Sequence, residues 1–112
     1  MELENLKAGE ILVVTPLDHR MDAYGAPDFK EKMSAFINEG NSRVVLNLSE
    51  VDFIDSSGLG SIISALKMLG TNGNMVICCV KSTVMSMFEL TRMDRVFQIF
   101  TTKEQAVAAL SN

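Results

Sequence analysis

Short, mainly apolar runs alternate along this chain with longer segments whose apolar residues recur at helical spacing, and this alternation is the strongest constraint on the fold. The runs are Ile11–Pro16, Val44–Leu48 and Met75–Val80. Runs of this length and composition are typical of buried strands, and the uninterrupted run Met75–Val80 is consistent with burial on both faces. The segment between the first two runs places apolar residues at i, i+4, i+7 and i+8, beginning with Phe29 and Met33. Alternating strands and helices predict an α/β domain with mostly parallel strand pairing and right-handed crossovers.

The order of elements that we expect is β-β-α-β-α-β-α-β-α. The first two strands are separated by a short turn that contains Gly, which predicts an antiparallel hairpin and therefore a mixed sheet. The segment Leu17–Ala26 is expected to be a loop. The extended segments expected are Glu2–Lys7, Ile11–Pro16, Val44–Leu48, Met75–Val80 and Val96–Phe100. Together these elements predict a single domain over residues 1–112, with a mixed four- to five-stranded sheet flanked by about four helices.

Start and stop signals mark the expected helices. Pro27 fits the first helical position, and Gly40 is placed to end that helix. Ser82 is expected to cap a short third helix, and Thr102 with Gln105 forms a capping-box pattern at the start of the last one. The residues expected in the core are Val13, Val45, Leu46, Ile54, Ile63, Leu66, Ile77 and Phe88.

Composition and charge exclude several classes of protein. The chain has 112 residues, of which 47% are hydrophobic, and this is too apolar for a disordered protein. A net charge of −4 argues against binding to nucleic acid or to an anionic membrane surface, because both need a basic surface. The longest apolar run, Met75–Val80, is far below the roughly 20 residues that span a bilayer, so no membrane insertion is expected. The acidic segment Met1–Asn5 lacks the pattern of a secretory signal, and a cytoplasmic location is expected.

The two cysteines, Cys78 and Cys79, are adjacent within an apolar run. Neighbouring residues on a strand point to opposite faces, so a bond between their sulfurs would be strained. They form no Cys-x-x-Cys motif and have no histidine nearby. We therefore expect two reduced, buried thiols and no metal site.

The most informative segment is Asp55-Ser56-Ser57-Gly58-Leu59-Gly60, at a predicted junction between a loop and a helix. A helix N-terminus offers free N–H groups and a partial positive charge, so a phosphate on a serine there would be stabilised. Two interpretations remain open. The serines either carry such a modification or simply cap the helix, and capping is the more common role for these residue types.

Other chemistries find little support in the sequence. The segment is not a Gly-x-Ser-x-Gly elbow, it lacks the lysine and spacing of a phosphate-binding loop, and His19 is the only histidine available for a triad. The acidic residues Asp18, Asp22, Asp52 and Asp55 would form either a hydrated cation site or a set of solvated loop carboxylates. The second interpretation is favoured, because their spacing is not that of a calcium loop. No catalytic residue, cofactor or metal is therefore predicted, and the protein is not expected to be an enzyme.

Three stretches of the chain resemble the STAS domain, and specifically the anti-sigma factor antagonists of bacterial partner-switching systems. The most specific is Val51–Gly60, with its Asp-Ser-Ser-Gly-Leu-Gly core. The second, Met21–Pro27, is similar to the family's Leu-Asp-Ala stretch before the first helix, and the third, Met87–Thr91, is similar to its Leu-Phe-(acidic)-x-(Ser/Thr)-Gly segment. With the order of elements, the resemblance covers nearly all of the chain.

The resemblance implies a regulator that binds other proteins and catalyses nothing. Its unphosphorylated form would bind a serine kinase that also acts as an anti-sigma factor. The kinase would phosphorylate Ser56 and so end the binding, and a metal-dependent serine phosphatase would restore it. Ser57 matches the next hydroxyl position, which is not the usual acceptor. The residues that the resemblance places at the partner-binding surface are Asp22, Asp55, Ser56, Ser57, Gly58 and Leu59.

Two positions depart from the family pattern. Arg20, or His19 in a shifted register, stands near the usual position of a first-loop glycine, and Arg92 stands where a glycine usually follows the threonine of the third stretch. Both add positive charge at the expected partner face and leave the partner and output open: a sigma-factor switch, secretion or biofilm control. The alternative is a constitutive STAS subunit of a larger complex, such as a lipid-transport ATPase, in which the serine only caps and packs.

Overall fold

A five-stranded mixed sheet forms the centre of the computed structural model, which describes residues 1–111. The strand order is β1-β2-β4-β6-β7. β1 pairs with β2 antiparallel, and the remaining pairs are parallel. A second, two-stranded sheet pairs β3 with β5. The strands are β1 (Leu3–Ala8), β2 (Ile11–Pro16), β3 (Arg20–Met21), β4 (Arg43–Asn47), β5 (Phe53–Ile54), β6 (Asn74–Cys78) and β7 (Ile99–Phe100).

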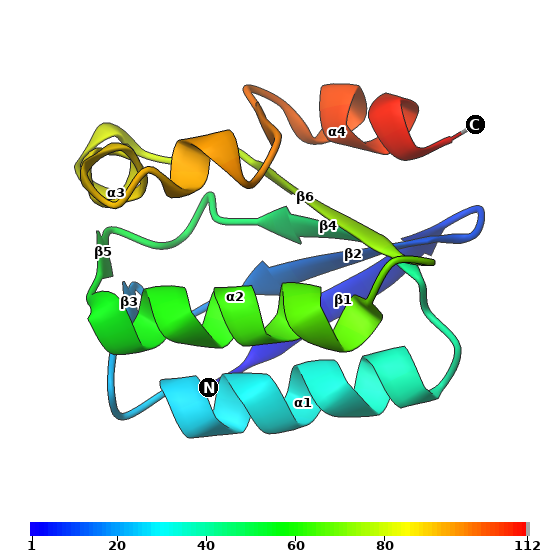
Figure 1. Cartoon of the computed structure of the whole chain (residues 1–112), viewed down its shortest axis with the longest axis horizontal. Helices are drawn as coiled ribbons and strands as arrows, with labels where there is room; N and C mark the ends of the chain where they lie inside the picture. The colour runs from blue at the N-terminus through cyan, green and yellow to red at the C-terminus, as the bar shows by residue number, and fades with distance from the viewer. Residues whose placement is uncertain (112) are drawn as a thin grey trace.

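Helices cover both faces of this sheet (Figure 1). They are α1 (Ala26–Asn38), α2 (Ser56–Leu69), α3 (Ser82–Leu90) and α4 (Lys103–Leu110), with a short 3₁₀ turn at Met93–Arg95. α1 and α2 lie side by side on one face, and α4 covers the other. The mixed sheet and its four helices are those expected from the alternating sequence pattern.

The core is divided by the sheet because successive strand residues point to opposite faces. Leu12 and Val14 of β2 lie in the larger cluster, which contains the inner faces of α1 and α2. Ile11 and Val13 belong to the smaller cluster, against Ala106 of α4. This explains why successive residues at the centre of the middle strands are apolar, since both faces of the sheet are covered there.

Most of the expected core residues are buried, but Ile63 and Leu66 are half-buried at the flank of the larger cluster. The expected burial of both thiols is also correct only in part. Cys78 is buried whereas Cys79 is half-buried, with its Sγ 3.3 Å from that of Cys78 and both thiols free. Burial, followed by the hydrogen bond from Cys79, raises the pKa of the Cys78 thiol.

Three expected boundaries are wrong. Ser82 begins α3 rather than capping it, because the cap residue is Lys81 and no side chain accepts a bond there. The last strand is confined to β7, because the chain before it turns through the Met93–Arg95 3₁₀ segment and leaves Val96 exposed. By contrast, the capping box of Thr102 and Gln105 is confirmed.

The third error concerns Leu17–Ala26, which was expected to be a loop throughout. It contains β3, whose two residues pair in parallel with the two residues of β5. Met21 is fully buried in the larger core cluster, while Arg20 is exposed. A pair of two-residue strands is too short to give a periodic signal, which is why the sequence pattern does not show it.

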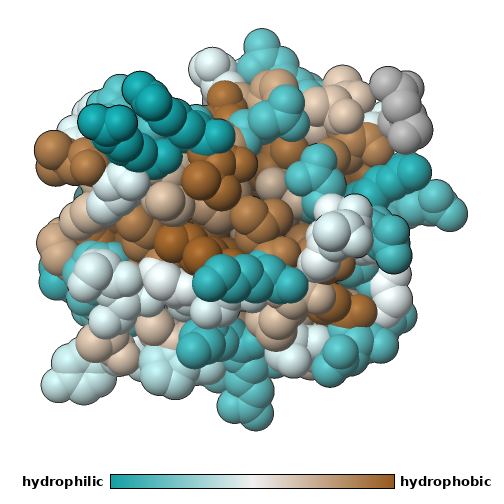
Figure 2. Space-filling model, viewed as in Figure 1, coloured by the Kyte–Doolittle hydropathy of each residue, from teal (hydrophilic) through white to brown (hydrophobic). Residues whose placement is uncertain are grey.

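Within residues 1–111, none of the helices combines the length and apolar character needed to cross a bilayer. On the face seen in Figure 2, apolar side chains reach the surface in a belt across the middle of the molecule, with hydrophilic groups on both sides.

Met21→Ala tests whether β3 depends on its buried side chain. Removing a fully buried methionine should lower the free energy of unfolding by about 2–5 kcal/mol. Met68→Ala is the matched control, because Met68 on α2 is 40% exposed and its truncation should cost less than about 0.5 kcal/mol. Urea unfolding curves measure both changes, and an equal, small effect of the two substitutions would contradict the assignment.

Candidate functional site

The small sheet of β3 and β5 brings together the two segments that contain Asp22 and Asp55. Its parallel register places Arg20 beside Phe53 and Met21 beside Ile54. The next residue of β3's segment is Asp22, and the next of β5's is the residue that begins the Asp-Ser-Ser-Gly motif. The backbone N–H of Asp55 donates to the Met21 carbonyl at 3.2 Å, which extends the parallel pairing to that point. Asp22 and Asp55 therefore lie at neighbouring positions, directly before the first turn of α2.

Asp55, not a serine, caps α2. Its side chain accepts a hydrogen bond from the Gly58 N–H at 2.8 Å, and its carbonyl accepts one from the Leu59 N–H at 2.9 Å. Ser56 and Ser57 are the first two helical residues and both are exposed. Neither hydroxyl makes a hydrogen bond to any group in residues 1–111. The interpretation in which the serines cap the helix is therefore wrong.

Gly58 lets the first turn of α2 pack directly on β3. A Cβ at this position would lie 2.2 Å from the Met21 carbonyl oxygen, so no side chain fits without a backbone shift. Gly58 and Leu59 are both buried. The structure gives these two residues a packing role that holds the helix start in place, and their predicted contact with a partner stays a prediction.

The carboxylate of Asp22 is held by local hydrogen bonds. It accepts from Arg20 Nε at 3.3 Å and from the Tyr24 backbone N–H at 3.1 Å. Partial desolvation raises the pKa of this carboxyl, but the hydrogen bonds from Arg20 and the backbone outweigh it and leave the pKa below its ordinary value. The guanidinium of Arg20 also lies over the ring of Phe53, with its central carbon 4.1 Å from the ring centroid. Asp22 is thus a charged, positioned acceptor.

The four aspartates considered as a cation site do not form one. Asp52 pairs with Lys81 Nζ at 2.5 Å and lies 3.4 Å from His19 Nδ1. The hydrogen bond from Lys81 holds the pKa of the Asp52 carboxyl below its ordinary value. Within residues 1–111, no group of three or more histidine, cysteine or acidic side chains is placed to hold a metal ion. The same ring nitrogen of His19, Nδ1, also lies 3.0 Å from the carbonyl oxygen of Glu50.

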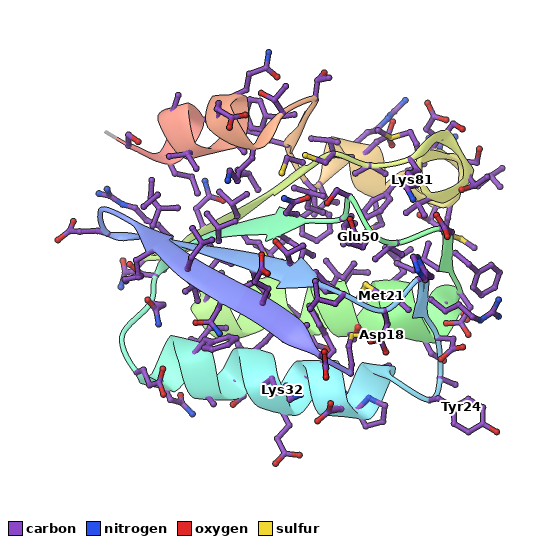
Figure 3. The ribbon with its side chains drawn as sticks, turned by 180° about the vertical axis from the view of Figure 1, so that it is seen from behind. Asp18, Met21, Tyr24, Lys32, Glu50 and Lys81 are labelled. Atoms are coloured by element: carbon purple, nitrogen blue, oxygen red, sulfur yellow. The ribbon has the colours of Figure 1, made fainter. Side chains whose placement is uncertain are left out.

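The two serines face different surroundings. Ser57 borders an open hollow of about 410 Å³ between α1 and α2, together with Lys30 and Ser64. Ser56 lies outside this hollow. On the same end of the molecule, the ring of Tyr24 is 97% exposed and projects away from the body, as Figure 3 shows.

The sequence marks Arg20 only as a departure from a motif and does not indicate its contact with the ring of Phe53. One signal was available: Arg20 to Asp22 alternates polar, apolar and polar residues, as a half-buried strand does. The segment is too short for that signal to be decisive.

The chain belongs to the STAS domain family, whose family model matches residues 3–106. It is 33% identical over 72 residues to the anti-sigma-B factor antagonist of Staphylococcus epidermidis, a match that covers 63% of this chain and 67% of the relative.

Solved structures agree on the fold. An anti-sigma factor antagonist from Mycobacterium paratuberculosis superposes with a TM-score of 0.91 at 21% identity, covering 99% of this chain and 94% of its own. The Bacillus cell fate determinant SpoIIAA in its phosphorylated form has a TM-score of 0.73 at 19% identity, covering 96% of this chain and 98% of its own.

Gly58→Ala tests the packing of α2 on β3. We expect a loss of about 1–3 kcal/mol in unfolding free energy, because the added methyl group meets the backbone oxygen of Met21. Gly60→Ala, two residues further along α2, is the matched control. A Cβ there has nothing within 4 Å, and alanine should stabilise the helix by about 0.5–1 kcal/mol. Opposite signs of the two changes in thermal or urea unfolding would support the close contact, and equal signs would exclude it.

Proposed function

We propose that this protein is a partner-switching regulator of the anti-sigma factor antagonist type, with Ser56 as its switch. The unphosphorylated form binds a serine kinase that also acts as an anti-sigma factor. Phosphorylation at Ser56 releases that partner, and a metal-dependent serine phosphatase regenerates the binding form. The protein acts by binding and has no catalytic activity of its own.

One observation carries this proposal: the Ser56 hydroxyl is exposed on the first turn of α2 and bonded to nothing in residues 1–111, because Asp55 already caps the helix. A serine that neither packs nor caps contributes little to the fold. It is accessible to a kinase, and its modification leaves the helix cap intact. Asp22, Asp55 and Ser57, which lie around it, are the partner-contacting residues that we propose.

The physical effect of a phosphate at this position has two opposing parts. A phosphate adds about −1.5 to −2 charges at neutral pH. The N-terminus of α2 stabilises an anion by typically 0.3–1 kcal/mol at an exposed site. At an interface, however, the same charge must be desolvated beside two carboxylates, and taking a charge out of water costs several kcal/mol. The modification should therefore abolish binding while the fold persists.

Relatives support the same conclusion. The chain shares its family with an anti-sigma-B factor antagonist and its fold with a structure of SpoIIAA in the phosphorylated form. A constitutive STAS subunit, the alternative raised by the sequence, would show no phosphate on the chain in its native cell and no dependence of binding on Ser56.

Substitution of the serines separates the switch from its neighbour. Ser56→Asp should weaken partner binding at least about tenfold, above about 1.4 kcal/mol, whereas Ser56→Ala should bind permanently and resist phosphorylation. Thermal stability should be nearly unchanged in both, because the hydroxyl has no hydrogen bond to lose. Ser57→Ala is the matched control and should remain phosphorylatable.

The measurements are intact-mass analysis and site mapping of protein recovered from its native cell, followed by quantitative co-purification of the bound kinase with each variant. A phosphate mapped to Ser57, or wild-type binding of the kinase by Ser56→Asp, would show this mechanism to be wrong.

A further inference from the structure

Arg20 stands out on the outer face of the small sheet because it is only partly engaged. Its Nε donates to Asp22 Oδ2 at 3.3 Å, and its guanidinium lies over the ring of Phe53. No other hydrogen bond of this side chain to residues 1–111 is present. The side chain is 62% exposed. Two terminal nitrogens, which together carry four N–H donors, are therefore free while the group is already oriented.

The position of this guanidinium relative to α2 follows from the backbone. Arg20 and Asp22 flank Met21, whose carbonyl accepts from Asp55 N–H and lies directly against Gly58. Phe53, under the guanidinium, lies three residues before Ser56. Neighbouring strands are about 4.8 Å apart, and three extended residues span about 10 Å. An arginine side chain and a phosphoserine together bridge a separation of this order.

From this arrangement we propose that Arg20 is the residue that binds the phosphate on Ser56. The inference rests on the proposed function, since it assumes that Ser56 carries the phosphate. The terminal nitrogens of Arg20 donate to two phosphate oxygens, while Nε keeps its bond to Asp22. Planar, bidentate pairing of this kind is the strongest way for a side chain to hold a phosphate, and lysine does not reproduce it.

Charge makes this pairing favourable. In the unmodified protein the charge of Arg20 is balanced by that of Asp22. A phosphate placed beside Asp22 and Asp55 adds about −2 charges to those of the two carboxylates, and Arg20 is a cation already bound to one of them. Phosphorylation then changes two groups on one face: the hydroxyl becomes an anion, and the free nitrogens of Arg20 are withdrawn from any partner.

The test uses the full chain with phosphoserine incorporated at position 56 during translation, so that no kinase is needed. Phosphorus NMR follows the second pKa of the phosphate, ordinarily about 6, at physiological ionic strength. We compare the unsubstituted phosphoprotein with Arg20→Gln and Arg20→Lys. The matched control is Lys81→Gln, which removes one positive charge from the side of the molecule toward α3, away from Met21 in Figure 3.

We expect Arg20→Gln to raise the phosphate pKa by about 0.5 or more, because a nearby guanidinium favours the dianion. Arg20→Lys should restore part of the difference, and Lys81→Gln should move the pKa less than Arg20→Gln does, because Lys81 Nζ is bound by Asp52 and salt screens charges that do not contact the phosphate. Equal shifts in Arg20→Gln and Lys81→Gln, or no shift in either, would overturn the proposal. This outcome is independent of whether a cellular kinase modifies Ser56, so the inference and the proposed function fail separately.

Discussion

The contact between the Met21 carbonyl and the first turn of α2 is the interaction on which the rest of the site depends. The oxygen accepts the Asp55 N–H and occupies the space that a side chain on residue 58 would need. This contact joins a two-residue strand to a helix of 14 residues. Met21 is itself fixed by burial in the core below α1 and α2. The core therefore sets the position of the helix start, and the helix start sets the position of Ser56.

The choice of cap decides what the serines are free to do. Three successive residues, Asp55, Ser56 and Ser57, are all good caps by residue type. The Asp55 carboxylate at the cap accepts a hydrogen bond from the Gly58 N–H. An acidic group at this position also interacts favourably with the positive end of the helix dipole. The hydroxyls that follow are left with no structural task. Asp55 alone therefore caps α2, and Ser56 beside it is left accessible to modification.

How much the sequence predicts depends on how long each signal is. Short, mainly apolar segments identify β2, β4 and β6, because a strand buried on both faces shows no alternation of polar and apolar residues. β3 and β5 are two residues each, and no periodicity exists in so short a segment. The motif at residues 55–60 marks the right place for the candidate site. Which residue caps the helix, and that Arg20 lies over Phe53, depend on distances between segments far apart in the chain.

A second departure from the family pattern also becomes clear only in three dimensions. Arg92 has a backbone φ of 61°, in the left-handed region that glycine enters freely and other residues enter at a cost of roughly 1–2 kcal/mol. The resemblance places a glycine at this position, and the backbone conformation supplies the physical reason.

The small sheet also bears on when the site forms during folding. The hairpin of β1 and β2 joins neighbouring residues, whereas β3 and β5 are 33 positions apart and share a ladder of two residues. A short ladder between distant segments repays little of the entropy lost in closing the loop, so we expect it to form after the helices have packed. Ser56 is consequently presented in its native setting only by a chain that has completed its fold. An enzyme that recognises this surface, and not merely a serine in an extended peptide, acts on finished molecules and passes over unfinished ones.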